Sequence, residues 1–321
     1  MEKKRVSLSY QYRRTRQQAK EAERRRLAPF VLAMKALHSV SVPGSMDPEE
    51  LERQRKSQEI LGKLVSPMNG LSWEPFSLGN LPAAWTRLQK SPGHRRVILY
   101  CHGGGYTSGN LGYARALSTK LCRATGFDVL AFEYRLAPEH PYPAALEDAL
   151  LAWEYLLGQH FAPEHILLAG DSAGGNLALV LSLLLKQKGR PLPGALLLFS
   201  PWTDLTLSGE TLESRADLDP VLTPEYVRAV RDAYAGEVSP RSPLLTPLLG
   251  DFSGFPPVLI QAGTHEILLS DSRRLEEKLR EAGVFCRLEE WEDMWHVFQM
   301  YPTRKASDAI RNVAYFLLAH L

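Results

Sequence analysis

A serine surrounded by glycines is the first feature of the sequence that could perform chemistry. Ser172 lies in the run GDSAGG, where the apolar stretch HILLAG gives way to NLALVLSLLLKQKG. The first stretch is typical of a buried strand and the second of a helix, so residues 170–174 are predicted to form the sharp turn between them. β-Carbons at Gly170 and Gly174 would clash with the neighbouring strand and helix. The pattern predicts a serine nucleophile at a helix N-terminus, and a simple Gly/Ser helix cap is the alternative.

A second glycine run could supply hydrogen-bond donors for this serine. The segment YCHGGGYTSGN follows the apolar stretch RRVILY, so its glycines are predicted to lie in a strand-to-helix loop. Acyl transfer by a serine hydroxyl needs donors for the oxyanion, and unobstructed backbone N–H groups can provide them. The predicted oxyanion hole consists of Gly103, Gly104, Gly105 and Ala173. A phosphate-binding loop is not favoured, because no GK[ST] motif follows the glycines. A dinucleotide-binding fingerprint is not favoured either, because Ser108 occupies the position of its last glycine.

The general base is expected late in the chain, after the acid, if the order is serine, acid, histidine. Nine histidines are present. His296, in the segment EDMWHVFQ, follows the last predicted strand and precedes the last predicted helix. His102 lies at a strand end before the serine and is expected to brace the glycine loop. His296 is therefore the predicted base.

Two carboxylates follow the penultimate predicted strand, in the segment PVLIQAGTHEILLSDSRRLEEKL. Asp271 stands at the start of a predicted helix, where an acidic residue meets the helix dipole and so has a structural explanation. Glu266 has no such explanation. A carboxylate in its position would hold the imidazole of His296 in the right tautomer and stabilise its cation. Glu266 is therefore the favoured acid, and Asp271 remains the alternative.

The elements that must position these residues follow an α/β pattern. From about residue 95 onward, short apolar runs alternate with longer helical patterns. Apolar runs without polar alternation are typical of strands buried on both faces by crossover helices, which predicts a mostly parallel sheet. Before this core, LSWEPFSL and AAWTRLQ are predicted to be two edge strands joined by a turn at GNLP.

Two segments outside this alternation are predicted to form a helical cap over the site. The first contains the helix PEELERQRKSQEILGKL, which Asp47 is well placed to cap, and the second contains the helix PEYVRAVRDAYAG. The predicted organisation is an N-terminal helical cap segment at 1–65, a first core part at 66–202, a cap insertion at 203–247 and a second core part at 248–321.

Composition limits the classes of function that the protein can have. At 321 residues and 45% hydrophobic, the chain can bury a large core, and its net charge of +2 indicates no nucleic acid partner. The basic N-terminal segment is interpreted as a solvated helix face, with an anionic surface as the alternative. No stretch is suited to spanning a bilayer and no cleavage site follows one, so we expect a cytoplasmic protein without stable membrane association. Cys101, Cys122 and Cys286 lack metal-ligand spacing, which predicts neither disulfides nor a zinc site.

Five motifs in order resemble one family. HGGGY, YRLAPEHPYPAALED, GDSAGGN, SPWTDLT and MWHVFQ together resemble the hormone-sensitive-lipase-like branch of the α/β-hydrolases, which are microbial carboxylesterases with a cap. The resemblance runs from about residue 71 to the end. It implies an eight-stranded, mostly parallel sheet and hydrolysis of short-acyl esters. By position, Ser172, Glu266 and His296 match the family's triad, and the HGGG glycines with Ala173 match its oxyanion hole.

Two departures from the family pattern stand out. The family's acid is commonly aspartate, whereas Glu266 stands at this position here. Glu133, before YRLAPE, stands where aspartate is expected. That position is interpreted as structural.

The resulting hypothesis is a serine carboxylesterase that forms an acyl-enzyme with a small ester and needs no metal or organic cofactor. Its activity should fall below about pH 6.5, because a protonated imidazole cannot act as a base. Tyr106 and Trp295 adjoin the catalytic segments and are predicted to line the substrate pocket. An amidase or peptidase with the same triad, and a non-catalytic binding homologue, are the alternatives. The sequence does not predict the physiological ester, the acyl chain length, the stereoselectivity or whether the chain forms a homodimer.

Overall fold

The computed structural model describes residues 28–29, 31, 46–64, 69–90 and 96–321. The chain divides into two compact units, residues 1–42 and 43–321, and every element below belongs to the second unit. The basic segment and the part of the predicted cap segment before residue 46 lie almost entirely outside the described residues.

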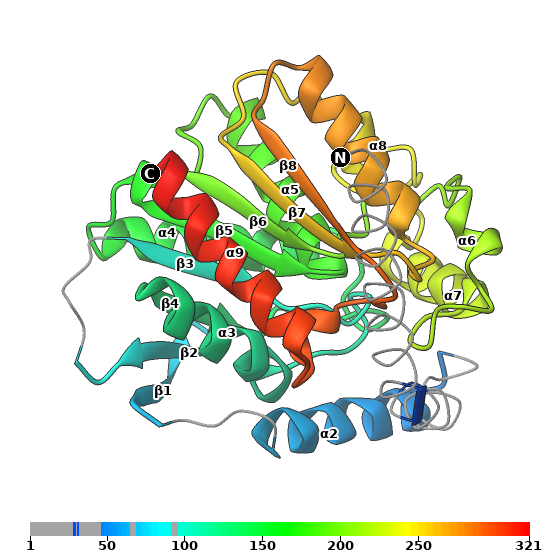
Figure 1. Cartoon of the computed structure of the whole chain (residues 1–321), viewed down its shortest axis with the longest axis horizontal. Helices are drawn as coiled ribbons and strands as arrows, with labels where there is room; N and C mark the ends of the chain where they lie inside the picture. Colours follow the sequence, from blue (N-terminus) through cyan, green and yellow to red (C-terminus); the bar gives the residue numbers. More distant parts are fainter. Residues whose placement is uncertain (1–27, 30, 32–45, 65–68, 91–95) are drawn as a thin grey trace, which may run out of the picture. The chain divides into compact units, whose positions relative to one another are not determined.

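A single eight-stranded sheet forms the centre of this unit (Figure 1). Its strands are β1 (Leu71–Leu78), β2 (Leu81–Leu88), β3 (Val97–Cys101), β4 (Asp128–Phe132), β5 (Ile166–Asp171), β6 (Ala195–Phe199), β7 (Val258–Gly263) and β8 (Cys286–Trp291). They lie in the order β1-β2-β4-β3-β5-β6-β7-β8, and only the pairs β1/β2 and β2/β4 are antiparallel. The eight-stranded, mostly parallel sheet predicted from the family resemblance is confirmed.

The prediction of two edge strands at the start of the sheet is half right. β1 is the edge strand, but β2 is internal, because it also pairs with β4 through the register Ala84↔Ala131. Ala83 and Ala84 are fully buried, as expected for a strand with neighbours on both sides. The two-residue turn Gly79–Asn80 joins the pair, and Leu81 already belongs to β2.

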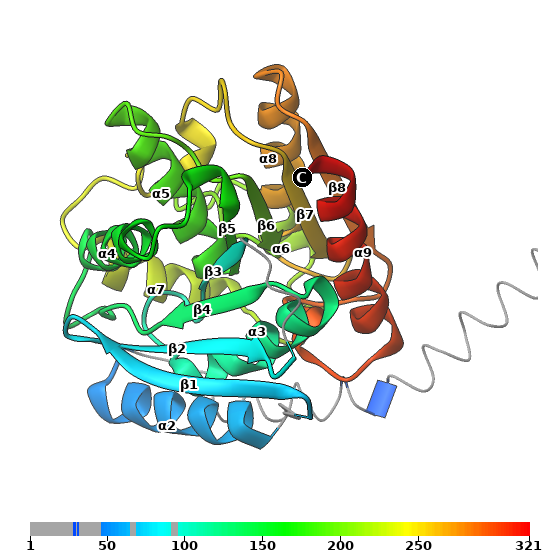
Figure 2. The ribbon, with the colours of Figure 1, turned by 90° about the vertical axis from the view of Figure 1, so that its left-hand side faces the viewer.

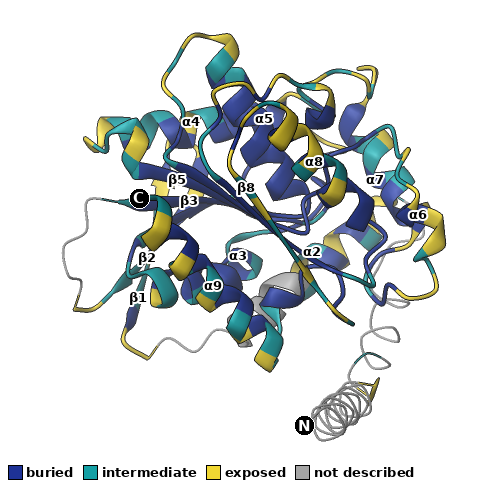
Figure 3. Ribbon diagram, turned by 45° about the horizontal axis from the view of Figure 1, so that its top comes forward, coloured by how far each residue is buried: buried dark blue, intermediate teal, exposed yellow. Residues whose placement is uncertain are grey.

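Helices cover both faces of the sheet, as Figures 1 and 2 show. α3 and α9 share one core cluster with residues of β3 to β7, so they cover the same face. α4, α5 and α8 cover the other face, and α5 is almost entirely buried (Figure 3). The bounds are α2 (Pro48–Leu64), α3 (Leu111–Thr125), α4 (Ala144–Gly158), α5 (Ala173–Gln187), α6 (Thr211–Ser214), α7 (Pro224–Ala235), α8 (Leu269–Glu281) and α9 (Arg304–His320), with short 3₁₀ turns η1 (Pro163–His165), η2 (Pro247–Leu249) and η3 (Phe298–Met300).

The two predicted cap segments both contact the glycine loop. Asp47 caps α2 by accepting the N–H of Glu49, as predicted, and Arg55 of α2 donates to the carbonyl of Thr107. Within 203–247 the chain forms α6 and α7 and no strand. α7 lies against the loop, because a β-carbon built on Gly105 would be 3.1 Å from Val230.

Candidate active site

Ser172 occupies the sharp turn between β5 and α5. Its backbone has φ 53° and ψ −120°, a conformation that is strained for a residue with a β-carbon. A β-carbon on Gly170 would lie 2.2 Å from the carbonyl oxygen of Gly174, and one on Gly174 would lie 2.1 Å from that of Cys101. The predicted steric need for both glycines is therefore confirmed. Glycine at these two positions lets helix α5 start directly above the ends of β3 and β5.

Glu266 and His296 come together beside the carboxyl ends of β7 and β8. His296 Nδ1 lies 3.4 Å from Glu266 Oε2, and both side chains are buried. The other carboxylate oxygen, Oε1, accepts hydrogen bonds from the Ser200 hydroxyl at 2.7 Å and from the N–H of Gly263. Because Oε1 is held by these donors, Oε2 remains directed at the imidazole.

Ser200 is a functional position that the sequence did not reveal. It follows β6 in a left-handed backbone conformation, with φ 48°. Its hydroxyl donates to Glu266 and accepts the N–H of Val297 at 3.0 Å. This one hydroxyl therefore links the acid to the residue after His296. The only signal in the sequence is its place at the start of the SPWTDLT motif.

The buried carboxylates around His296 control its protonation. Burial alone would lower the pKa of the imidazole, but the hydrogen bond and the charge of Glu266, together with the charges of Asp219 and Asp171, raise it above its usual value. Asp219 comes from the predicted cap insertion, and its carboxylate accepts the N–H of Ile267 at 3.0 Å. Burial raises the pKa of Asp219 to about 6. The insertion therefore contributes a carboxyl group to the surroundings of the base.

Asp271, the alternative acid, faces a different segment. It lies in the first turn of α8, and its Oδ2 accepts the N–H groups of Thr203 at 2.8 Å and Asp204 at 2.9 Å. Its other oxygen lies 3.2 Å from the Arg274 guanidinium. Burial raises the pKa of Asp271 to about 7. Asp271 therefore fastens α8 to the segment after β6, and its place in the first turn of α8 agrees with the structural explanation that the sequence offered. The helix itself begins at Leu269, earlier than predicted.

The glycine loop lies beside the serine turn, but the N–H groups of its three glycines do not all have an acceptor among the described residues. The N–H of Gly103 donates to Asp171 Oδ1 at 2.9 Å, so it already has an acceptor within the chain, and its prediction as an oxyanion donor is not supported. Gly104 and Gly105 adopt positive φ angles of 112° and 62°. Within the described part of the chain, the N–H groups of Gly104, Gly105 and Ala173 have no acceptor. These three donors are the ones available to an oxyanion.

Asp171 is a second position that the sequence did not reveal. Its carboxylate, fully buried next to Ser172, accepts hydrogen bonds from the hydroxyls of Tyr100 and Tyr113 in addition to the N–H of Gly103. Burial raises the pKa of this carboxyl, against the opposing effect of the two tyrosine hydrogen bonds. The side chain joins the serine turn to the glycine loop.

His102 and Glu133 have the structural surroundings that were expected. His102 Nδ1 lies 2.8 Å from the carbonyl oxygen of Gly103, and its ring stacks on Tyr134 at a centroid distance of 4.1 Å. Burial lowers the pKa of His102 to about 4, so the ring is neutral and braces the loop. Glu133 accepts the N–H of Leu111 at the start of α3.

The two predicted pocket residues are both fully buried. The Tyr106 hydroxyl donates to Asn176 at 2.8 Å, and its ring stacks on Tyr234 of α7 at 3.6 Å. The Trp295 ring meets Tyr301 edge-on at 5.7 Å. Contact of Tyr106 and Trp295 with a substrate stays a prediction.

Three further observations concern metals, thiols and membranes. In the described ranges, no group of three or more His, Cys, Asp and Glu side chains is arranged to hold a metal ion. All three cysteines are free thiols. Among the described residues, no helix is both long and apolar enough to cross a bilayer.

Comparison with known proteins identifies the family. Residues 98–300 match the family model of the α/β hydrolase fold. An acetyl-hydrolase of Streptomyces hygroscopicus is 39% identical over 80% of this chain and 84% of its own length, and an esterase of Acinetobacter venetianus is 39% identical over 69% and 74%. The crystal structure of an esterase from the bacterial hormone-sensitive lipase family superposes with a TM-score of 0.84 at 34% identity, covering 91% of this chain and 97% of that one. The chain belongs to the α/β-hydrolase family, in its hormone-sensitive-lipase-like carboxylesterase branch.

Proposed function

We propose that Ser172, His296 and Glu266 form the catalytic triad of this carboxylesterase. The contact that carries the proposal is His296 Nδ1 to Glu266 Oε2 at 3.4 Å, with both groups buried and Glu266 held by Ser200. The strained turn at Ser172 adds support, since such turns present a nucleophile above the sheet. The N–H of Ser172 donates to the carbonyl of Phe199 at 2.9 Å, and the next residue, Ser200, accepts the N–H of Val297 at 3.0 Å. The serine turn and the segment that carries His296 therefore meet at the end of β6.

The oxyanion hole is proposed to consist of the N–H groups of Gly104, Gly105 and Ala173. Gly103 is left out because its N–H donates to Asp171. Asp171 serves instead as a positioning residue, which holds the glycine loop beside the serine turn. Ala173 lies at the N-terminus of the 15-residue helix α5, where the helix dipole also favours negative charge.

The reaction proceeds in two acyl-transfer steps. His296 accepts the hydroxyl proton of Ser172 as its oxygen attacks the ester carbonyl, and the loop donors stabilise the resulting oxyanion. The imidazolium then returns a proton to the leaving alcohol, and an acyl-enzyme remains. Water attacks this ester by the same route and releases the acid. Glu266 stabilises the imidazolium in both steps.

We further propose that α2 and the insertion at 203–247 form the cap and that the substrates are small, short-acyl esters. Both segments contact the glycine loop, and the insertion supplies Asp219. The relative named an acetyl-hydrolase supports short acyl groups. We still expect that the protein is cytoplasmic and does not bind nucleic acid.

The test compares turnover of p-nitrophenyl esters, from acetate to octanoate, by the wild type and by Ser172→Ala. We expect the shortest esters to be hydrolysed fastest and turnover to vanish in the variant. Ser182→Ala is the matched control, because Ser182 lies on the same helix and its hydroxyl donates to the carbonyl of Ala178. The matched amide, p-nitroacetanilide, should react far more slowly than the acetate, since an amine leaving group needs more help from the general acid. Turnover retained by Ser172→Ala would contradict the proposal, and equal amide turnover would favour an amidase.

A further inference from the structure

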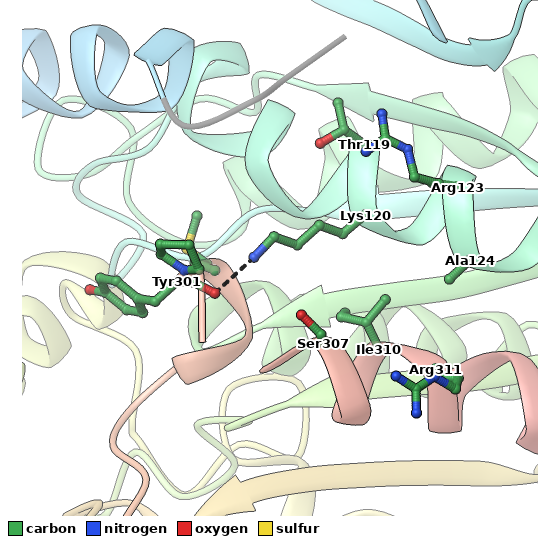
Figure 4. Close-up of a pocket in the computed structure, with 10 residues that line it drawn as sticks. Thr119, Lys120, Arg123, Ala124, Tyr301, Ser307, Ile310 and Arg311 are labelled. Carbon is green, nitrogen blue, oxygen red and sulfur yellow. Dashed lines mark hydrogen bonds between the residues drawn. The ribbon is translucent and has the colours of Figure 1, made fainter. Parts of the chain in front are cut away.

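A cavity of about 570 Å³ lies between α3, the η3 turn and α9 (Figure 4). Volumes of this order are typical of small-molecule sites. It is lined by Thr119, Lys120, Arg123, Ala124, Met300, Tyr301, Pro302, Ser307, Ile310 and Arg311. None of the proposed catalytic groups lines it, so the cavity is separate from the proposed active site.

Three cationic side chains line this cavity, and no lining residue is acidic. Lys120 extends from α3 toward η3, where its ammonium group donates to the carbonyls of Gln299 at 2.6 Å and Tyr301 at 3.1 Å (Figure 4). These partners carry no charge. Burial lowers the pKa of Lys120 to about 8, so the group is mostly protonated at neutral pH but poorly solvated. An anion would restore the solvation that burial removes.

Arg311 provides a second cation on α9, at the end of the cavity away from the Lys120 ammonium (Figure 4). Its guanidinium pairs with Asp308 at 3.0 Å and is 58% exposed, which leaves other N–H donors of its planar fork for a ligand. Arg123 lies on the α3 side and donates to the carbonyl of Asn69. The cavity is therefore positive on two sides.

The remaining walls are apolar. Ala124, Met300, Pro302 and Ile310 lie among the cations. A bare inorganic anion would leave this apolar surface in contact with water, whereas an aliphatic chain would cover it. The ligand class that satisfies both parts of the cavity is a small anion with a short hydrocarbon tail.

We propose that this cavity binds a small aliphatic carboxylate, with the carboxylate at Lys120 and the tail against Met300 and Ile310. Acids released from short-acyl esters belong to this class. That identification of the natural ligand rests on the proposed function, but binding of the carboxylate does not.

The experiment titrates the Ser172→Ala chain with sodium hexanoate by isothermal calorimetry. We expect a dissociation constant below about 1 mM. The affinity of butanoate, pentanoate and hexanoate should rise by about fourfold per methylene, because each buried methylene adds a similar hydrophobic gain. Hexanol, which has the tail without the charge, and sodium chloride, which has the charge without the tail, should bind at least about tenfold more weakly.

Two variants locate the site. Lys120→Gln should weaken hexanoate by about tenfold, since it removes a charge-assisted hydrogen bond. Arg311→Gln should change the affinity by less than about threefold, because its guanidinium lies away from the carboxylate. Lys278→Gln, at an exposed lysine of α8, is the matched control and should bind as before. If Lys120→Gln unfolds, the position of bromine in a soaked crystal keeps the test decisive. A crystal of the Ser172→Ala chain soaked in ω-bromohexanoate should show bromine between α3 and α9.

Several results would overturn the proposal. These are no binding of hexanoate up to about 10 mM, hexanol binding as tightly as hexanoate, unchanged affinity in a folded Lys120→Gln chain, or bromine found only near residue 172. Loss of esterase activity plays no part in these readouts. Failure of the carboxylate site and failure of the proposed triad are therefore distinguished.

Discussion

Replacing Glu266 by Gln tests the assignment of the triad acid. The substitution keeps the shape of the side chain but removes its negative charge from 3.4 Å beside His296 Nδ1. The imidazolium that forms in the transition state then loses its buried counter-charge. A glutamine amide can also donate to Nδ1 and so favour the wrong tautomer.

The size of the effect follows from the geometry. Two unit charges separated by 3.4 Å attract each other by about 5 kcal/mol at an effective dielectric constant of about 20. If the whole attraction is lost in the transition state, kcat falls by about a thousandfold to ten-thousandfold. KM should change little, because the charge acts on the imidazolium and not on the bound ester. Some activity should remain from the oxyanion donors.

Asp271→Asn is the matched control, since it neutralises a carboxylate of similar burial only five residues away in sequence. Asn can still accept one of the N–H bonds from Thr203 and Asp204, so we expect lower stability but a kcat within about threefold of the wild type. The assay is steady-state hydrolysis of p-nitrophenyl acetate. A greater loss of kcat in Asp271→Asn than in Glu266→Gln would refute the reasoning.

Three further outcomes are expected. The kcat/KM of the wild type should fall on acidification with an apparent pKa above about 6.5, because the pKa of His296 is raised and the base therefore becomes protonated at a higher pH. In Glu266→Gln, measured over the same pH series, burial should dominate the pKa of His296, so the fall of kcat/KM should occur at lower pH. Asp171→Asn should lower kcat by about tenfold to a hundredfold and leave KM nearly unchanged, because weaker bonds to Gly103 and the tyrosines displace the oxyanion donors. The pKa of Asp271 is about 7 in the folded protein and about 3.9 in the unfolded chain, so the folded state binds the proton of this carboxyl more tightly. The contribution of Asp271 to stability is therefore lost as pH rises from about 4 to about 7. Over that range the melting temperature of Asp271→Asn should fall less than that of the wild type.

Most of the fold could be predicted from the sequence, because buried parallel strands and crossover helices leave unambiguous apolar runs. The errors fall where tertiary contacts decide the outcome. β2 looks like an edge strand locally, and its pairing with β4 depends on residues about 45 positions away. α8 starts at Leu269, before the predicted run RRLEEKLREAG. The bonds of Asp271 to the N–H groups of Thr203 and Asp204 join segments far apart in sequence, which no local pattern could indicate.

The proposed triad was accessible to sequence reasoning because chain order and motif position restrict the choices. Ser200 and Asp171 were not, since a serine after a strand and an aspartate before the nucleophile have no distinctive periodicity. Their importance depends on partners distant in sequence, namely Glu266 and Gly103. The same limit applies to Gly103, because the direction of each N–H in a glycine loop depends on the three-dimensional structure and not on the local sequence.

The most direct measurement is rapid-quench mass spectrometry of the chain mixed with p-nitrophenyl acetate. The account predicts a burst of p-nitrophenol equal to one equivalent per chain wherever deacylation is the slower step, with an acetyl group on the peptide that contains Ser172. In Ser172→Ala both the burst and the acetyl group should disappear. An acetyl group on another side chain that turns over at the catalytic rate, or undiminished hydrolysis by the variant, would contradict it.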